Sequence, residues 1–585
     1  MKKLTMILMA MLLGTASLWA RPALSKPVDV KQPDGTVITL RLRGDEFLSF
    51  TTTVDGYTVL KGEDGFYRYA EKGADGQLKA TEVIARNPEA RTTQDLSFLA
   101  DRKKMVAPKM SESQRQRKEM AAQMYAPAYV KSAASHRSPT SIWKRINYDN
   151  FKGLVVLVEY SDFKFKTENP REFYQKLTSE KNYTDNSKTN YPVNVEGSAR
   201  DYFYDNSMGI FDPTFDVVGP VQLDMKATDV GGRDVTNETQ VKMFKSALNK
   251  LNADVDFSQY DLDSDGYIDM VYFIFAGYGS YVEGNDPGYL WPHANNWTGY
   301  SSWLGMPKYD GKSFGRYACS VEIQDYESQK AQHQYLDGIG TICHEFSHVL
   351  GLPDLYETNT NQTGLHTLFN WDIMDYGTYN NDGNTPPAYS AYERFYMGWL
   401  TPRVLTEPEY VTLHPLSEGE ALLISTTDEH NLIGWNPSPT TFYLLENRKK
   451  EGWDQYVPGN GMLITKVTYR ASLWRTNRVN VSTRTMGVDI LEAKENTSTS
   501  GKSSDAFPAG AVKQWTDVKD HEITSITRSA TDGIIRFSYR GADLPEGVEE
   551  VQSDKVQSTK VLRNGQLYIL YKGQMYDIQG RRVKE

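Results

Sequence analysis

The chain has 585 residues, which at roughly 100 to 200 residues per domain predicts about three or four domains. Hydrophobic residues at 39% and aromatic residues at 12% are typical of an ordered globular protein and exclude a mainly disordered one. The net charge of −10 gives no field that attracts polyanions, so we expect no nucleic-acid partner.

Residues 1–20 have the layout of a secretory signal peptide. Two lysines follow Met1, an apolar stretch runs from Leu4 to Leu13, and small residues lead to Ala20. The apolar stretch is shorter than the ~20 residues that a membrane-spanning helix needs. We therefore expect cleavage after Ala20, no transmembrane segment in the mature chain, and a secreted or cell-surface protein.

Residues 21–100 predict a small β-rich domain. Short runs of alternating apolar and polar residues are separated by Asp-Gly turns, as at 37–42 and 66–69. Residues 101–140 then change to Lys, Arg, Gln, Ser and Ala, and we expect a basic, exposed and partly helical linker that proteases can reach.

Apolar strands alternate with helices from residue 141 to residue 405, as in a catalytic α/β domain. Residues 154–158 and 268–276 predict buried strands, and residues 171–177 predict a short helix. Residues 406–545 have mostly strand patterns, and we expect a β-sandwich there.

Residues 261–269 repeat the first nine positions of a calcium-binding loop. Side-chain carboxylates and one backbone carbonyl would bind the ion, from Asp261, Asp263, Asp265, Asp269 and Tyr267. The loop departs from an EF-hand because Tyr272 replaces the glutamate at position 12. We expect a structural calcium site, with an acidic Asp-Gly turn as the alternative.

Only two cysteines occur, Cys319 and Cys343. In an oxidising compartment they could form a disulfide next to the motif described below. Two buried free thiols are the alternative, because spacing in the sequence does not fix the distance between them.

Residues 344–348 have the pattern H-E-x-x-H. Residues four apart on a helix lie on one face, so His344 and His348 can bind one zinc ion. Glu345 would be the general base that takes a proton from a zinc-activated water and passes it to the leaving amine. The pattern predicts hydrolysis of peptide bonds without a covalent intermediate.

We expect a third zinc ligand just after this helix. Gly351 allows the left-handed conformation that ends a helix, and the chain then turns back to bring Asp354 towards the ion. Tyr356 and Glu357 are the alternatives. Three protein ligands leave one position open, as in catalytic zinc sites.

The full run H-E-x-x-H-x-x-G-x-x-D, followed by Met374 in W-D-I-M-D-Y-G, is similar to the metzincin plan. The resemblance implies that Met374 lies beneath the metal. It also places Tyr376 where some metzincins have a tyrosine that steadies the tetrahedral intermediate, with a packing role as the alternative.

Further segments make residues 140–480 resemble the immune inhibitor A-type peptidases. They are Tyr389 to Trp399, Phe211-Asp212-Pro213, and Glu446-Asn447-Arg448 with Gly452-Trp453-Asp454. The resemblance implies a secreted endopeptidase made as a precursor, with residues 21–100 as its propeptide. That segment has no cysteine, so a propeptide thiolate does not keep the precursor inactive. Asp45 is one of several acidic candidates for that role.

Residues 546–585 resemble the C-terminal sorting domains of Bacteroidetes proteins that are exported by the type IX route. The resemblance rests on two short runs that begin at Gly565 and Gly573. It implies the type IX secretion machinery as a partner. A last β-hairpin of the sandwich is the alternative.

These patterns predict a secreted zinc metalloendopeptidase that acts on extracellular proteins or peptides. Its fold would be multidomain α+β, with a metzincin-like peptidase domain between an N-terminal β-rich propeptide and a C-terminal β-sandwich. The alternative is a catalytically silent surface protein that binds or adheres through its β-domains. The intact His344, Glu345 and His348 argue against that alternative.

Overall fold

The computed structural model describes residues 21–115, 148–231, 237–296, 305–325, 335–358, 365–482, 486–544 and three strands between 558 and 576, apart from positions 25, 113, 283, 306 and 499. The expected signal peptide at 1–20 and most of the expected linker at 101–140 lie outside these residues. None of the described helices is both long and apolar enough to cross a membrane.

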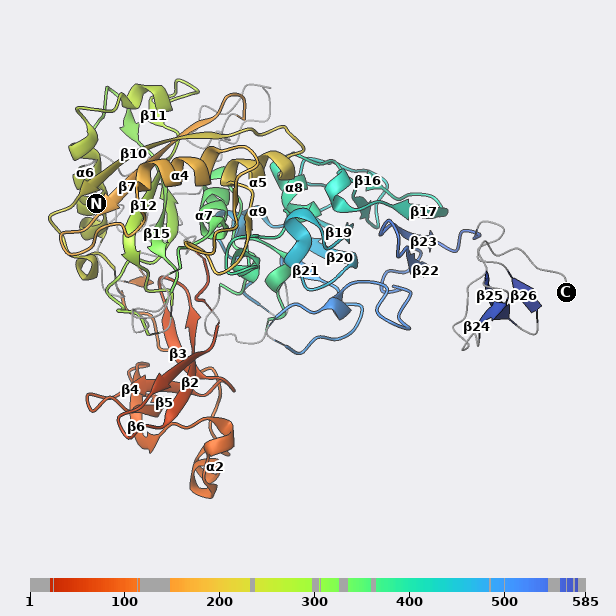
Figure 1. The fold of residues 1–585 in the computed structure, drawn as a ribbon, viewed down its shortest axis with the longest axis horizontal. Helices are drawn as coiled ribbons and strands as arrows, with labels where there is room; N and C mark the ends of the chain where they lie inside the picture. Colours follow the sequence, from red (N-terminus) through yellow and green to blue (C-terminus); the bar gives the residue numbers. More distant parts are fainter. Residues whose placement is uncertain are drawn as a thin grey trace, which may run out of the picture.

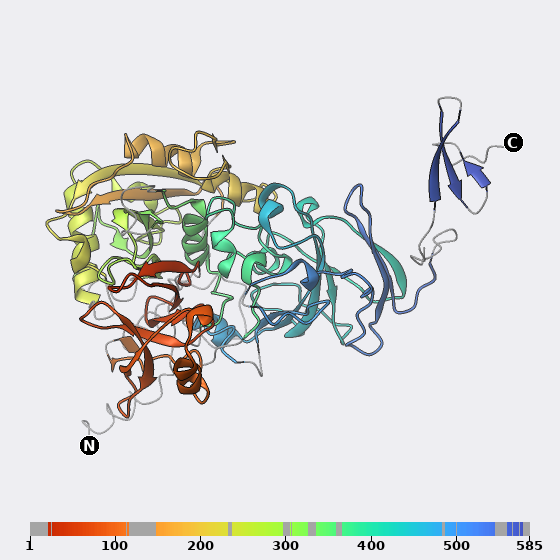
Figure 2. The same ribbon diagram turned by 60° about the horizontal axis from the view of Figure 1, so that its bottom comes forward.

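The N-terminal part forms a six-stranded antiparallel sheet in simple chain order. Its elements are β1 (Val28–Lys31), β2 (Val37–Gly44), β3 (Ser49–Thr53), β4 (Thr58–Lys61), β5 (Tyr67–Lys72), β6 (Leu78–Ile84) and helix α2 (Thr93–Leu99). Alternate residues of β2, Ile38 and Leu40, face a small apolar core closed by Leu99. Figures 1 and 2 both show this sheet against the body that carries the next strands.

The described start of the expected linker, residues 101–110, is exposed in part and contacts the N-terminal sheet in part. Thr58 Oγ1 donates a hydrogen bond of 2.9 Å to Val106 O, and Ala107 is buried. Lys109 N donates to Gly76 O at 2.8 Å. Residues 101–110 therefore run along the N-terminal sheet, held by backbone groups that composition does not reveal.

The central sheet has the order β10-β7-β12-β15-β13, with β13 antiparallel to an otherwise parallel sheet. Its strands are β7 (Lys152–Glu159), β10 (Thr214–Gln222), β12 (Val271–Tyr278), β13 (His293–Asn296) and β15 (Arg316–Ile323). Val155 and Leu157 face one apolar cluster, whereas Val156 and Val158 face another. Both faces are covered, which explains the continuous apolar run in β7.

Four helices cover this sheet. They are α4 (Pro170–Ser179), α5 (Ala199–Asn206), α6 (Asn237–Leu251) and α7 (Ile339–Leu350). The apolar side chains of α4, α5 and α7 belong to one cluster and those of α6 to the other, on the opposite face. Two small sheets complete this body, from β8 (Thr184–Asp185) with β9 (Val195–Glu196) and from β11 (Tyr267–Ile268) with β14 (Ser313–Phe314).

Two further sheets follow helix α8 (Ala391–Met397). The first contains β16 (Arg403–Val404), β18 (Leu422–Ile424), β19 (Thr441–Arg448), β20 (Gly461–Thr468) and β21 (Val488–Ile490), and the second β17 (Glu409–Leu413), β23 (Ile535–Tyr539) and β22 (Ile523–Arg528). Leu445 and Ile464 join the second sheet in one apolar cluster. Leu444 and Leu463, on the other face, pack into the cluster around α7.

The residues expected to form a separate C-terminal domain therefore also complete the core behind α7. Helix α9 (Ala471–Arg475) follows β20 and leads the chain back towards that core, where Trp474 is buried. The remaining strands, β24 (Ser558–Arg563), β25 (Gln566–Tyr571) and β26 (Gln574–Tyr576), form an antiparallel sheet.

Short 3-10 helices connect these elements. They are η1 (Pro88–Ala90), η2 (Ala227–Asp229), η3 (Phe257–Tyr260), η5 (Phe369–Trp371), η6 (Tyr376–Tyr379), η7 (Leu416–Glu418), η8 (Gly452–Tyr456) and η9 (Ser503–Asp505).

Candidate metal centre

Helix α7 presents His344 and His348 on one face, and both side chains are fully buried. The helix ends as the sequence predicts. Gly351 has a φ of 113°, and its N–H donates to Ser347 O and His348 O. At the other end, a Cβ on Gly340 would come within 2.1 Å of Thr378 O, so the first turn of α7 packs directly on the backbone of η6.

Three acceptor atoms converge beside this helix. His344 Nε2 lies 3.2 Å from His348 Nε2, and Asp354 Oδ1 lies 3.3 Å and 3.2 Å from these two nitrogens. The turn after Gly351 thus brings Asp354 to the histidines, as the sequence predicts. Among the described residues, Glu357, one alternative third ligand, is not in this cluster of possible carboxylate and histidine ligands. Tyr356, the other alternative, is buried.

Backbone carbonyls set the proton positions of both imidazoles. His344 Nδ1 lies 2.7 Å from Ile373 O, and His348 Nδ1 lies 2.8 Å from Leu352 O. A carbonyl only accepts, so each Nδ1 carries a proton and each ring directs its Nε2 to the centre. Burial lowers the pKa of His344, which favours its neutral form.

The centre therefore fits a cation. The Nε2 atoms of both histidines and Asp354 Oδ1, which is buried without a hydrogen bond in the described structure, face one another at 3.2–3.3 Å. A metal ion between the three atoms could accept a lone pair from each of them. Two imidazoles and one carboxylate form a common donor set for catalytic zinc.

Asn477 fixes the orientation of the carboxylate. Its Oδ1 accepts a hydrogen bond of 2.8 Å from Asp354 N, and its Nδ2 donates to Asp354 Oδ2. Asn477 follows α9 and is fully buried. The metal centre consequently depends on a residue outside the segment 141–405 that the sequence suggests as the catalytic domain.

Glu345 faces the N-terminal segment of the chain. Its Oε1 accepts a hydrogen bond of 3.0 Å from Arg21 N, while Oε2 is buried with no partner in the described structure. Burial raises the pKa of Glu345 well above its usual range. Asp45, an acidic candidate for blocking the site, accepts bonds from Phe47 N and Leu48 N in its own turn.

Met374 and Tyr376 lie on the segment that leads into η6. Met374 is fully buried, and its carbonyl accepts a hydrogen bond of 2.8 Å from Leu355 N, next to Asp354. The preceding carbonyl, of Ile373, is the one that orients His344. Tyr376 stacks on Phe369, and burial raises its pKa to about 12 although the nearby Arg43 opposes this shift.

The expected calcium loop brings three of its four carboxylates together. Ligand atoms of Asp261, Asp263 and Asp265 all lie within 4.8 Å of one another. Asp269 is outside this cluster, and its Oδ2 accepts from Leu262 N at 2.7 Å. Lys312 Nζ lies 2.7 Å from Asp261 Oδ2 and compensates part of the negative charge.

The two cysteines are both buried and free. Cys319 belongs to the apolar cluster that contains α6, and Cys343 to the cluster on the opposite face of the central sheet. The central sheet lies between the two residues and excludes a disulfide. Of the two alternatives, the structure therefore has two free thiols.

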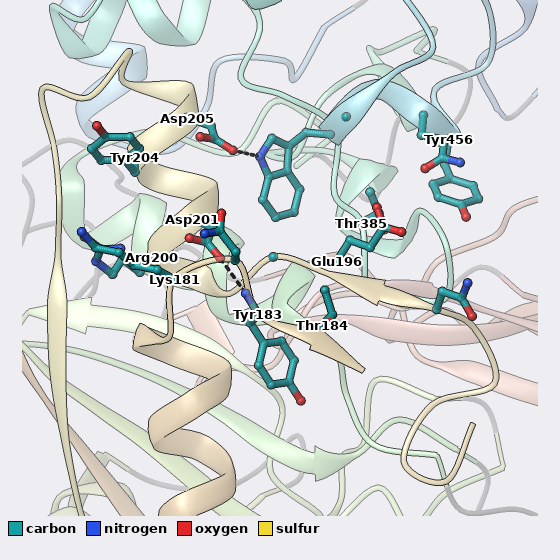
Figure 3. Close-up of a pocket in the computed structure, with 16 residues that line it drawn as sticks. Lys181, Tyr183, Thr184, Glu196, Arg200, Asp201, Tyr204, Asp205, Thr385 and Tyr456 are labelled. Carbon is teal, nitrogen blue, oxygen red and sulfur yellow. Dashed lines mark hydrogen bonds between the residues drawn. The ribbon is translucent and has the colours of Figure 1, made fainter. Parts of the chain in front are cut away.

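A separate pocket of about 580 Å³ lies beside α5 (Figure 3). Asp205 Oδ2 accepts a hydrogen bond from Trp453 Nε1 at 2.9 Å, and Asp201 Oδ2 accepts from Tyr183 N at 3.2 Å. Its 16 lining residues include neither the histidines of α7 nor Asp354. The pocket is thus distinct from the candidate metal centre.

Several residues of the site carry no signal in the sequence. Arg21 and Asn477 come from distant parts of the chain, whereas Asp337 lies just before α7 and contacts Arg21, and none of the three belongs to a recognisable motif. Only Arg21 has a suggestive position, because it directly follows the expected cleavage site after Ala20.

Comparison with known proteins gives a matching family and related chains. Residues 144–400 match the family described as immune inhibitor A peptidase M6, catalytic domain. The chain is 26% identical over 306 residues to immune inhibitor A of Bacillus thuringiensis subsp. alesti, which covers 45% of this chain and 42% of that protein. It is 23% identical over 328 residues to the pre-pro-metalloprotease PrtV of Vibrio cholerae serotype O1, with coverage of 50% and 34%.

The matched region thus spans less than half the length of each of these relatives. The comparisons support a metallopeptidase, and the mixed, multidomain helix and sheet structure is consistent with a peptidase M6 domain.

Proposed function

We propose that this protein is a secreted zinc-dependent endopeptidase that hydrolyses peptide bonds of extracellular proteins. His344, His348 and Asp354 would hold the zinc, and Glu345 would be the general base. One observation carries the proposal: the Nε2 atoms of the two buried histidines and the buried Asp354 Oδ1 converge to within 3.2–3.3 Å of one another. The match to a metallopeptidase family supports it.

The residues of the proposed active site have separate roles in the reaction. When bound, zinc would polarise the scissile carbonyl and make a water molecule more acidic. Glu345, with one carboxylate oxygen unengaged in the described structure, accepts the proton of the attacking water and delivers it to the leaving amine. Ile373 and Leu352 hold the imidazoles, and Asn477 holds Asp354, so the ligands are oriented before the metal binds.

The test of this function is Glu345→Gln in the zinc-loaded full-length chain. We expect loss of at least about 100-fold in the hydrolysis of unfolded protein, because the amide cannot accept the proton. Glu418→Gln, on the exposed surface, is the matched control. Hydrolysis that survives both Glu345→Gln and a zinc chelator would overturn the zinc mechanism, whereas a zinc-loaded unmodified chain without any hydrolysis would favour the catalytically silent binding protein.

Tyr376 remains a proposed catalytic residue that steadies the tetrahedral intermediate. Tyr376 is the first residue of η6, whose backbone supports α7, which is compatible with that role, and its stacking on Phe369 is compatible with packing. Tyr376→Phe separates the two: lower kcat with unchanged melting temperature supports catalysis, and unchanged kcat removes the role. Tyr204→Phe, on an exposed tyrosine, is the control.

Residues 21–100 are a proposed propeptide. The contact of Arg21 N with Glu345 supports this, because a segment that engages the general base keeps substrate away from it. Arg21→Ala in the full-length chain should weaken the contact and raise peptide hydrolysis. Lys26→Ala, with a side chain 63% exposed, is the control and should leave the activity unchanged.

The remaining proposals concern calcium and export. Asp261, Asp263 and Asp265, with Tyr267 O and Asp269 as the further expected ligands, would bind a structural calcium ion. The segment 1–20 would direct export, and 546–585 would engage the type IX secretion machinery. Deleting residues 546–585 should retain the protein in the cell if the last proposal is correct.

A further inference from the structure

Arg21 is buried completely beside Glu345 and fills a chamber of its own. The main chain is held at both ends, because Arg21 N donates to Glu345 Oε1 and Arg21 O accepts from Trp291 Nε1, each at 3.0 Å. We call the surroundings of its side chain the arginine chamber, defined by Asp337, Thr341, Tyr281 and Tyr379.

The arginine chamber surrounds the guanidinium group with two aromatic rings and a carboxylate, and leaves Nη2 buried without a partner in the described structure. Arg21 Cζ lies 4.4 Å from the ring centre of Tyr281 and 4.1 Å from that of Tyr379. Nη1 donates to Asp337 Oδ2 at 3.1 Å and also to Thr341 Oγ1. Nε donates to Tyr379 Oη at 3.1 Å. Aromatic faces and a carboxylate together favour arginine over an ammonium or a neutral side chain.

Burying the Asp337 carboxylate in the arginine chamber would be energetically unfavourable if the chamber were empty. Only 5% of this residue is exposed, and a buried carboxylate without a cation is strongly unfavourable. The chamber therefore requires a cationic occupant or water whenever Arg21 leaves it.

The position of Arg21 N relates the chamber to the chemistry. In peptide hydrolysis the general base delivers a proton to the nitrogen of the leaving half of the substrate. The nitrogen that Glu345 contacts here is the main-chain nitrogen of Arg21. Arg21 thus stands where the residue after the scissile bond would stand, and the chamber is the pocket for the side chain of that residue.

We propose that the arginine chamber selects arginine as the residue that follows the scissile bond of substrates, with Asp337 as the specificity-determining residue. This rests on the proposed function, because it assigns a subsite to that active site. The N-terminal segment then occupies the site as an arginine-containing substrate would. A chamber that merely anchors this segment would give no preference among free substrates.

The first test maps cleavage sites. Full-length zinc-loaded protein carrying Arg21→Ala, which vacates the chamber, is incubated with a mixture of unfolded proteins, and the new N-termini are sequenced by mass spectrometry. We expect arginine at these N-termini at least about tenfold above its abundance in the substrates. Adding Asp337→Asn should abolish the enrichment, whereas Asp382→Asn, outside the chamber, should preserve it.

The second test needs no turnover. Binding of argininamide and of citrullinamide, its neutral counterpart of the same shape, to the same Arg21→Ala protein is measured by calorimetry. We expect argininamide to bind at least about tenfold more tightly. This comparison also decides the case if Asp337→Asn fails to fold.

The outcomes separate the two proposals. Cleavage without enrichment of arginine, or equal binding of the two amides, would overturn the proposed arginine specificity but would not contradict the proposed peptidase function. Absence of all cleavage together with tight binding of argininamide would contradict the proposed peptidase and keep the chamber as a guanidinium site.

Discussion

Asn477 holds Asp354 by two hydrogen bonds, one to its backbone and one to its side chain, although 123 residues separate them in the sequence. The side-chain amide of Asn477 accepts a hydrogen bond from the backbone N–H of Asp354 and donates one to its carboxylate. Its own position is fixed because Asn477 O accepts a bond of 3.1 Å from Thr358 Oγ1. The third proposed ligand is thus oriented by the C-terminal part of the chain.

Replacing Asn477 should therefore weaken metal binding. Loss of a hydrogen bond behind a metal ligand typically lowers affinity by about 10–100-fold. Asn477→Ala should show such a loss, and Asn477→Asp a larger one, because a second carboxylate would repel Asp354. Competition with a zinc-binding dye measures the affinity. Asn194→Ala, at the exposed surface, is the control, and equal affinities for all variants would refute the role of Asn477.

Arg448 connects two of the segments that carry the resemblance to the immune inhibitor A-type peptidases, Glu446-Asn447-Arg448 and Gly452-Trp453-Asp454. It is fully buried and donates to Glu446 Oε1 at 3.0 Å, to both carboxylate oxygens of Asp454, and to the carbonyls of Trp371 and Ala388. The network ties β19 and η8 to the segment before Met374. These motif residues thus support the site from behind.

Removing this arginine should destabilise the whole body of the protein. Arg448→Met leaves two buried carboxylates without their cation, which should cost about 3–5 kcal/mol of unfolding free energy. Urea denaturation followed by tryptophan fluorescence measures the change. Lys519→Met, with a side chain 90% exposed, should change stability by less than about 0.5 kcal/mol. Similar midpoints for both variants would show that the network adds nothing.

The sequence predicted those parts of the site that local geometry determines. The spacing of His344 and His348, the helix end at Gly351 and the return to Asp354 all depend on eleven consecutive residues, and the structure places them as expected. Strands such as β7 were predictable for a similar reason, because its apolar run needs burial on both faces.

Contacts between distant segments could not be predicted in this way. Arg21 meets Glu345 across 324 residues, and no periodic pattern in either segment specifies their meeting. Asp337 looks like any polar residue before a helix until Arg21 is seen beside it. The separation of Cys319 from Cys343 likewise depends on which face of the central sheet each residue meets.

Calcium should stabilise the protein if the loop at 261–269 binds it. A ligand that binds only the folded state at 100 times its Kd adds about 2.7 kcal/mol, so the melting temperature should rise with calcium. Asp263→Asn should reduce the rise, and the exposed Asp254→Asn should not. Lys312→Met should increase calcium affinity, because it removes the ammonium 2.7 Å from Asp261. If calcium does not change the melting temperature of the unmodified chain, the result would favour a simple Asp-Gly turn without a bound ion.

Asp489, on β21, should make stability depend on pH. Burial raises its pKa from 3.8 to about 6, so the folded chain binds this proton more tightly than the unfolded chain does. The resulting stabilisation is complete below about pH 4 and is lost as the pH rises through about 6, by at most about 3 kcal/mol.

Asp489→Asn keeps an uncharged side chain and should remove this loss. The measurement is the difference in unfolding free energy between the variant and the unmodified chain from pH 4 to pH 7. His366, paired with Glu492 nearby, also interacts with Asp489, so part of the difference reflects the charge of His366. The unfolding free energy of Asp489→Asn should increase relative to that of the unmodified chain as the pH rises. For Asp543→Asn, at an exposed position, the difference in unfolding free energy should not change with pH. A flat difference for Asp489→Asn as well would mean that its carboxylate is solvated in the folded protein.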